Sequence, residues 1–206
     1  MLQQHRAPGH RLLTVLTDRY GMPPSTLQRI AALIVLWGTF EGELERALWR
    51  LSGEDPTGKT PTTDKMQLSQ KLDRLRELGG TSADKDWNVT IKLICDLAGN
   101  LKLYRDAIVH GQLLPSSVGG GFVLNPGWHG ERRKRRGTVA HIDDHIVGIM
   151  LDAFYELTAV IQVIARDGSM QEMIAGVLSR RDNLKKAKSH SGEIIHPTEL
   201  MNLETY

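Results

Sequence analysis

The sequence predicts an all-α protein: a bundle of four to five helices with a small β-hairpin-like insertion between the third and the fourth helix. Two observations support this fold class. Apolar residues recur at steps of three and four along four long segments, which is the period of a helix that buries one face. The segment that breaks this period, residues 112–142, has glycine clusters around two short β-like runs, "FVL" and "TVAHI". Strands and helices do not alternate along the chain, so a parallel α/β sheet is not expected.

The domain organisation follows from length and composition. A chain of 206 residues with 40% hydrophobic residues fits one domain with appended ends. We expect residues 1–22 to be a lead-in segment, residues 23–188 the helical domain and residues 189–206 a loose C-terminal tail. The single cysteine, Cys95, excludes an intramolecular disulfide and a cysteine-rich zinc site. Because it lies among apolar residues of a predicted helix, we expect a buried, inert thiol.

The first helix is predicted to begin in "PPSTLQ" and to run to about residue 51. Ser25 can cap its start, and Gln28 three residues later completes a capping-box pattern. Its apolar residues fall on one face and are Leu33, Trp37, Phe40, Leu44, Leu48 and Leu51. A loop over residues 52–63, with two prolines and two glycines, should separate it from a second helix over about 64–78.

The third helix is predicted to start near residue 82 or 83 and to end at His110, since Gly111 suits a helix C-cap. The apolar residues of its core-facing stripe are Trp87, Ile91, Ile94, Ala98, Leu101 and Ile108. Between Leu101 and Ile108 the series continues through Arg105, so an arginine is expected on the buried stripe. Burying an unpaired charge is costly, so Arg105 must find a counter-charge or a ligand there.

A fourth helix is predicted from residue 143 or 144 to about 165, and a fifth over about 169–187. The fifth helix overlaps a basic block, "SRRDNLKKAK" (179–188). A second basic block in the insertion contains Arg132, Arg133, Lys134, Arg135 and Arg136. This second block is either a solvated loop or a binding surface for RNA phosphates. The formal net charge of +2 is too small to indicate nucleic-acid binding by itself.

The stretch "RDAIVH", residues 105–110, places an arginine and a histidine at the end of the third predicted helix. RNA cleavage through the 2′-hydroxyl needs a proton acceptor, a proton donor and a cation at the phosphate. His110 can serve either proton role near neutral pH, and Arg105 stays charged and binds phosphate oxygens in a fork. Asp106, about 100° around the helix from Arg105, could orient the histidine or nearby backbone. Two such groups at a dimer seam would supply all these functions without a metal.

This motif resembles the signature of the HEPN superfamily, in which four to six residues separate an arginine from a histidine and a polar residue follows the arginine. The resemblance covers roughly residues 25–165 and is strongest at 104–111. It implies a helical bundle that forms a homodimer with two motifs facing one another across a cleft. It also implies a metal-independent endoribonuclease of the toxin or defence type, without a cofactor, with Arg105, Asp106 and His110 as catalytic residues. The resemblance alone suggests an antitoxin protein as a partner.

Other interpretations of these residues stay open. HEPN members without the motif are RNA- or protein-binding modules, so a non-catalytic interaction module is the alternative function. Arg105 could simply pair with Glu41 or Glu45 of the first helix. His110 could be a helix-end residue that the helix dipole stabilises.

A literal Walker A sequence, "GEDPTGKT" (53–60), raises nucleotide binding as a third function. Such a loop cradles phosphates only when it joins a strand to a helix. The preceding residues, "ELERALWRLS", have a helical period, and Pro61 follows the motif directly. We therefore expect a polar loop between two helices.

Metal binding and membrane insertion are not expected. The spacings of the other histidines considered, His129, His141 and His145, match no zinc site, so surface or capping roles are favoured. The N-terminus lacks the apolar segment of a secretory signal, and the most apolar run, residues 30–40, is too short to span a membrane. A cytoplasmic location follows as the expectation.

Overall fold

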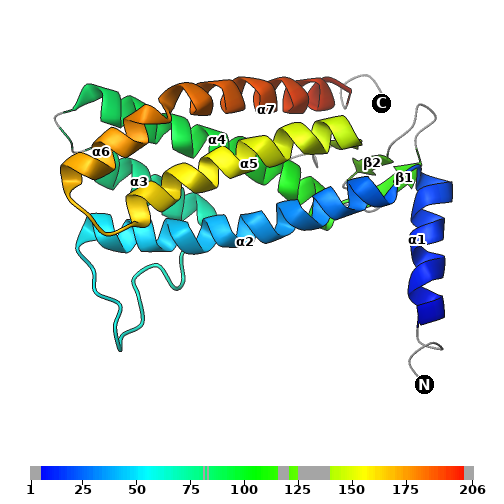
Figure 1. Cartoon of the computed structure of the whole chain (residues 1–206), viewed down its shortest axis with the longest axis horizontal. Coiled ribbons are helices and arrows are strands. Elements are labelled where there is room, and N and C mark those ends of the chain that lie inside the picture. The colour runs from blue at the N-terminus through cyan, green and yellow to red at the C-terminus, as the bar shows by residue number, and fades with distance from the viewer. Residues whose placement is uncertain (1–5, 81, 83, 116–120, 125–139, 202–206) are drawn as a thin grey trace, which may run out of the picture. The chain divides into compact units, whose positions relative to one another are not determined.

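The computed structural model describes residues 6–80, 82, 84–115, 121–124 and 140–201, and these form seven helices and three short strands (Figure 1). The helices are α1 (Arg6–Tyr20), α2 (Pro24–Ser52), α3 (Leu68–Gly80), α4 (Lys85–His110), α5 (Asp144–Ala165), α6 (Met170–Ser179) and α7 (Arg181–Met201). The strands are β1 (Gln112–Pro115), β2 (Gly121–Leu124) and β3 (Ala140–Ile142). The predominantly helical character predicted from the sequence is confirmed.

The chain divides into two compact units. The first comprises Met1–Leu33, Lys102–Leu151 and Glu193–Tyr206, and the second comprises Ile34–Leu101 and Asp152–Gly192. Helices α2, α4, α5 and α7 each contribute residues to both units.

The first unit contains an antiparallel sheet in the order β1-β2-β3. Strands β2 and β3 overlap the two β-like runs in the sequence, whereas β1, "QLLP", was not predicted. The small core of this unit is formed by Met22, Ile142 and Val147. Partly buried hydrophobic residues around it are Tyr20, Leu27, Ile30, Ile108, Leu113 and Leu151. The sheet is joined to α4 by the buried Tyr104, whose hydroxyl donates to the carbonyl oxygen of His141 over 3.2 Å.

The first turns of α2 and α5 are joined through Asp144. Its carboxylate accepts hydrogen bonds from the hydroxyls of Thr26 and Ser25, the latter over 2.9 Å. Arg29 also donates to the main-chain carbonyl of Asp144 over 2.6 Å. Ser25 therefore does not act as the N-cap acceptor predicted from the sequence, because its hydroxyl donates to a carboxylate 119 residues away.

The second unit is built on the apolar rows predicted for the long helices. Along α2, the predicted row is at most 3% exposed from Leu33 to Leu48, while Leu51 is only half-buried. Trp37 packs edge-on against Phe154 of α5, with ring centroids 5.4 Å apart. Trp87 is buried too, and its indole donates to the carbonyl of Gly79 over 2.9 Å. The interpretation of these two tryptophans as packing residues is confirmed.

Gly79 is required where α3 meets α4. The sequence predicts that this helix ends at Gly79-Gly80, and α3 ends at Gly80. A Cβ atom at position 79 would lie 2.8 Å from two side-chain carbons of Ile91. The glycine therefore permits close packing of the two helices.

Cys95 is fully buried, and its thiol donates to the carbonyl of Leu72 over 3.5 Å. Burial raises the pKa of this thiol to about 12. The thiolate is therefore not populated near neutral pH, which agrees with the predicted inert cysteine.

The ends of the described chain are more helical than the sequence predicted. Residues 6–20 of the expected lead-in form α1, and α7 continues to Met201 through most of the expected loose tail. The single helix expected over 169–187 is divided at Arg180 into α6 and α7. Ser169 and Glu172 form a capping box that starts α6.

Basic residues of the block at 179–188 form ion pairs with acidic residues of other helices. Arg180 pairs with Glu156 of α5, and Arg181 pairs with Asp86 of α4 over 2.7 Å. Lys188 pairs with Asp96 of α4 over 2.8 Å. These partners lie far away in sequence, so the local composition gave no sign of them.

Among the described helices, α5 alone is long and apolar enough to cross a membrane by length and composition. The core helix of a soluble protein passes the same test. Several of the α5 residues that make it apolar, including Phe154, Leu157 and Ile161, are fully buried within the protein.

Candidate functional site

The three residues of the predicted motif lie in the last two turns of α4, within the first unit. One guanidinium nitrogen of Arg105 donates to Oδ1 of Asp106 over 2.9 Å. The ammonium group of Lys102 donates to Oδ2 of the same carboxylate. The side chain of Arg105 is 27% exposed, that of Asp106 30% and that of Lys102 39%. The cluster is therefore half-buried at the surface.

The Asp106 carboxylate is held in its ionised form by its two cations. Burial alone raises the pKa of Asp106, but the hydrogen bonds and charges of Lys102 and Arg105 outweigh burial, so its pKa lies below the usual value. Two cations therefore bind one ionised carboxylate at this place on α4.

Arg105 is not on the buried stripe of α4, which corrects the prediction from periodicity. Tyr104 and Ala107 are buried instead, at 2% and 4% exposure. After Leu101 the buried series steps by three residues to Tyr104 rather than by four to Arg105. Both steps lie within the arc that a helix can bury, and packing against the sheet selects Tyr104.

Helix geometry places Lys102, Asp106 and His110 on one face of α4, because each is four residues from the next. Arg105 lies about 100° from Asp106 around the helix, and about 140° from His110. Arg105 and His110 of one chain therefore point in different directions, with Asp106 between them. The exposed His110 ends the helix, and its side chain forms no hydrogen bond or ion pair with the part of the chain that the structure describes.

The predicted partner of Asp106 needs a correction. Asp106 could have oriented His110, but the donors that the structure gives it are Lys102 and Arg105. Glu41 and Glu45, the two residues considered as partners of Arg105, bind the Trp37 indole and Lys71.

Lys102 was missed by the sequence interpretation. Its signal was present as the spacing K-x3-D-x3-H over residues 102–110, which puts three chemically active side chains on one helix face. The spacing between Arg105 and His110 does not include Lys102, which lies one helical turn before Asp106.

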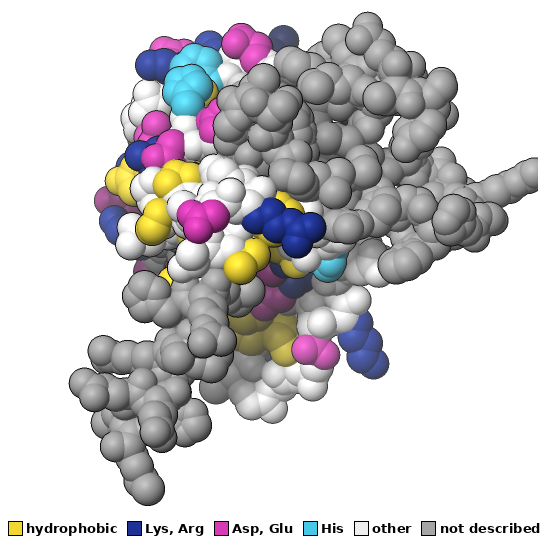
Figure 2. All heavy atoms as spheres, turned by 90° about the vertical axis from the view of Figure 1, so that its right-hand side faces the viewer, with side chains coloured by type: hydrophobic (Ala, Val, Ile, Leu, Met, Phe, Trp, Pro, Cys, Tyr) yellow, Lys and Arg dark blue, Asp and Glu magenta, His cyan; other side chains and the backbone are white. Residues whose placement is uncertain are grey.

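The predicted substrate-binding residues Arg132, Arg133, Lys134, Arg135 and Arg136 lie outside the described residues, as does His129. The other basic block, at 179–188, is largely occupied by the ion pairs of α7. Figure 2 shows acidic, basic and hydrophobic side chains mixed over the described part of one face of the protein.

The described residues contain no group of three or more side chains suited to a metal ion. His141 lies on β3 with its Nε2 atom 3.3 Å from Asp143, whose other carboxylate oxygen accepts from the amide of Ile146 at the start of α5. His145 is exposed on α5. The predicted surface role fits the exposed His145, while the side chain that accepts from an amide at the start of α5 is Asp143 and not a histidine.

The Walker-like segment is a loop that follows helix α2, not a strand. Glu54 accepts from the amide and the hydroxyl of Thr62, at 2.8 and 2.6 Å, and these bonds lower its pKa. Asp55 accepts from the amide of Thr57 over 3.0 Å. Within the motif the Thr57 amide donates to the Asp55 carboxylate and the Lys59 amide donates to the carbonyl of Pro56, whereas a phosphate-binding loop directs its amides at the ligand.

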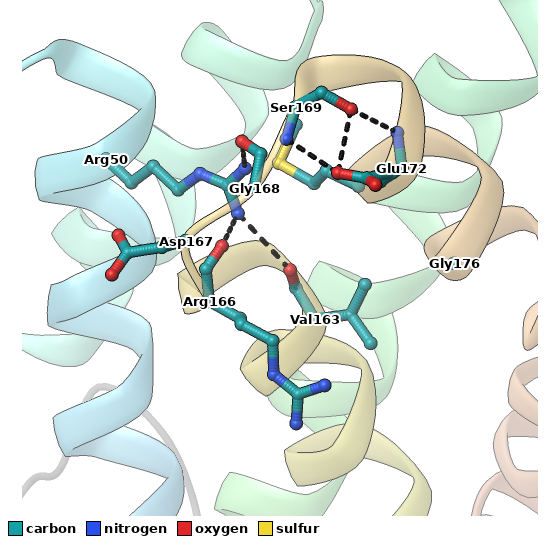
Figure 3. Close-up of a pocket in the computed structure, with 9 residues that line it drawn as sticks. Arg50, Val163, Arg166, Asp167, Gly168, Ser169, Glu172 and Gly176 are labelled. Atoms are coloured by element: carbon teal, nitrogen blue, oxygen red, sulfur yellow. Dashed lines mark hydrogen bonds between the residues drawn. The ribbon is translucent and has the colours of Figure 1, made fainter.

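A pocket of about 430 Å³ lies where α5 ends and α6 begins (Figure 3). Arg50 of α2 reaches into its wall and donates to the carbonyls of Ile164, Arg166 and Gly168. Because main-chain oxygens already bind its guanidinium, Arg50 has a structural role in the wall of this pocket.

No protein-family model, curated protein or solved structure matches this chain.

Proposed function

We propose that this protein is a metal-independent endoribonuclease similar to the HEPN enzymes, acting on RNA as a homodimer. On this proposal α2 to α5 correspond to the bundle of that superfamily, and residues 112–142 are an insertion into it. The supporting observation is the end of α4, where the exposed His110 shares a face with Asp106, and Asp106 holds Arg105 and Lys102. A cytoplasmic location and an antitoxin partner belong to the same proposal.

The chemistry assigns a role to each side chain. One imidazole takes the proton of the ribose 2′-hydroxyl, whose oxygen attacks the phosphorus atom. The bond from phosphorus to the 5′-oxygen breaks, and a second imidazole gives that oxygen a proton. Arg105 neutralises the charge that develops on the phosphate oxygens. The products are a 2′,3′-cyclic phosphate and a 5′-hydroxyl end, and no metal ion takes part.

One chain does not direct Arg105 and His110 to the same point, so a second copy is part of the proposal. Leu103 and Val109 are 39% and 42% exposed, and each is three residues from Asp106. If two α4 helices pack antiparallel about Asp106, Leu103 of each copy contacts Val109 of the other copy. Exposed apolar residues that flank a polar centre in this self-complementary way suit a twofold interface.

The charges at such an interface would include cations beside each carboxylate. The two Asp106 carboxylates would approach one another near the twofold axis, where they would repel if they were alone. Each is accompanied by Lys102 and Arg105, which donate to it. Lysine and arginine are also the side chains that bind phosphodiester oxygens.

The test is cleavage of single-stranded RNA in excess EDTA. The wild-type protein should yield cyclic-phosphate ends, and His110→Ala should abolish cleavage while helix content and unfolding stay as in the wild type. His145→Ala, which removes another exposed histidine of the first unit, is the matched control and should cleave normally. Absence of cleavage by the wild-type protein on a panel of structured and unstructured RNAs would refute the proposal.

A non-catalytic interaction module is the second candidate function, and one observation favours it. On α2, Val35 is 69% exposed and Ile34 is 37% exposed, and the following Gly38 and Gly42 are also on the surface. A Cβ atom at either glycine would meet nothing within 4 Å. If the wild-type protein lacks RNase activity while Val35→Asp abolishes capture of a partner protein, this second function replaces the first.

A further inference from the structure

We infer that Lys102 is a phosphate-binding residue of the same site and that Asp106 holds it ready for RNA. This inference rests on the proposed function, since it names a further group that contacts the RNA substrate. It starts from the position of Lys102 one helical turn before Asp106, on the face that also contains His110.

The arrangement around Asp106 is that of two cations shared by one anion. Arg105 and Lys102 bind different oxygens of the carboxylate, so neither displaces the other. An ammonium group has three N–H donors, and Asp106 takes one from Lys102. Donors remain on Lys102 for a phosphate oxygen, and its side chain is 39% exposed, so a ligand in solvent can reach it.

Helix stability does not explain the pair. Pairs four residues apart stabilise a helix best when the acidic residue comes first, and here Lys102 precedes Asp106. A carboxylate near the C-terminal end of a helix also opposes the helix dipole, and Asp106 is four residues from the end of α4. By both criteria the helix gains less from this arrangement than from the reverse order, so the effect of Asp106 on the neighbouring cations is the better explanation.

Lys102 also has a distinct place in the proposed dimer. In the antiparallel pairing of α4 about Asp106, Lys102 of one copy lies opposite His110 of the second copy, because both are four residues from Asp106. The lysine of one copy would therefore hold the phosphate on which the histidine of the other acts. At each end of the cleft, one chain would therefore bind the phosphate and the other chain would transfer the proton.

The experiment measures binding separately from cleavage. In a His110→Ala background, anisotropy of a fluorescently labelled 15-nucleotide oligouridylate gives the dissociation constant over a series of salt concentrations. Lys102→Met should weaken binding severalfold and reduce the slope of log K against log salt by about 0.7, the value for one lost phosphate contact with a single strand. Lys102→Arg, which keeps the charge, should retain most of the binding.

Lys92→Met is the matched control, because Lys92 is an exposed lysine on the same helix away from the cluster. It should leave both the dissociation constant and the salt slope unchanged. If Lys102→Met binds the oligonucleotide as Lys92→Met does, the inference is overturned. If Lys102→Met loses binding but the wild-type protein never cleaves RNA, Lys102 stands as a phosphate-binding residue and only the nuclease proposal fails.

Discussion

Arg50, near the end of α2, donates a hydrogen bond over 2.9 Å to the main-chain carbonyl of Ile164, in the last turn of α5. The same side chain also donates to the carbonyl of Gly168 over 2.7 Å (Figure 3). The last four carbonyls of a helix lack partners within it, and a cation at that end also interacts favourably with the helix dipole. Arg50 therefore terminates α5 from another helix.

Replacing Arg50 by methionine should destabilise the protein by about 1–3 kcal/mol, because carbonyls at the end of α5 lose a charged donor. Lysine at this position should restore only part of the loss, since a single ammonium cannot reproduce the planar fork. Urea unfolding measures both effects. Arg46→Met is the control: Arg46 is 66% exposed in a 3.4 Å pair with Glu43, and its loss should change stability by less than about 0.5 kcal/mol. Equal effects at the two positions would contradict the structural role of Arg50.

Asp144 should make stability depend on pH in the acid range. Hydrogen bonds from the hydroxyls of Thr26 and Ser25 lower the pKa of its carboxyl in the folded protein. Its stabilising contribution is therefore complete above the unfolded pKa of about 3.9 and is lost as pH falls through the lower folded pKa.

Asp144→Asn should therefore be less stable than the wild type at about pH 7, and the difference should shrink as pH falls below about 4. Urea unfolding across this range is the measurement. Asp152→Asn removes an exposed carboxylate of the same helix and should show no comparable difference at either pH. A stability difference for Asp144→Asn that is constant across the range would show that ionisation of this carboxyl is not involved.

The Walker-like loop should not bind nucleotide. The amides of Thr57 and Lys59 already donate to acceptors within the loop, and the loop follows a helix. Calorimetric titration with ATP and magnesium should show no saturable binding, and Lys59→Ala should leave RNA cleavage unchanged. Micromolar ATP binding that disappears in Lys59→Ala would restore nucleotide binding as a function.

The proposed α4 interface should be sensitive to charge at its apolar residues. Leu103→Asp or Val109→Asp should convert the dimer to a monomer, because an unpaired charge would be buried against the second copy. Sedimentation equilibrium measures the mass. Val89→Asp is the control, since Val89 is 51% exposed on the same helix but outside the interface. A wild-type monomer, or a dimer that survives both substitutions, would rule out this interface.

Some features of the fold could be predicted from single residues and their near neighbours. The period of apolar residues in α2, α4 and α5 was sufficient to predict three long helices and most of their buried rows. The burial of Cys95 followed in the same way. These predictions succeed because a helix that packs on one side must repeat apolar residues near its own period of 3.6 residues.

The candidate site was predictable only in part. The sequence located Arg105, Asp106 and His110 at the end of one helix, but the buried position predicted for Arg105 belongs to Tyr104. The group that Asp106 orients was predicted to be His110 or nearby backbone, and Lys102, four residues away, was left out. Periodicity fixes the direction of a side chain only to within a broad arc, and packing decides which residues within that arc are covered.

The sequence by itself therefore determined that the chain is mostly helical and which faces of its long helices are apolar. Only the tertiary structure decided that Ser25 binds Asp144, that Arg50 terminates α5, and that the basic α7 is held by acidic residues of α4. Helical period and apolar faces are properties of neighbouring residues and can be recognised in a short window. Polar partners about a hundred residues apart have no local signal, because their pairing exists only after the helices between them have packed.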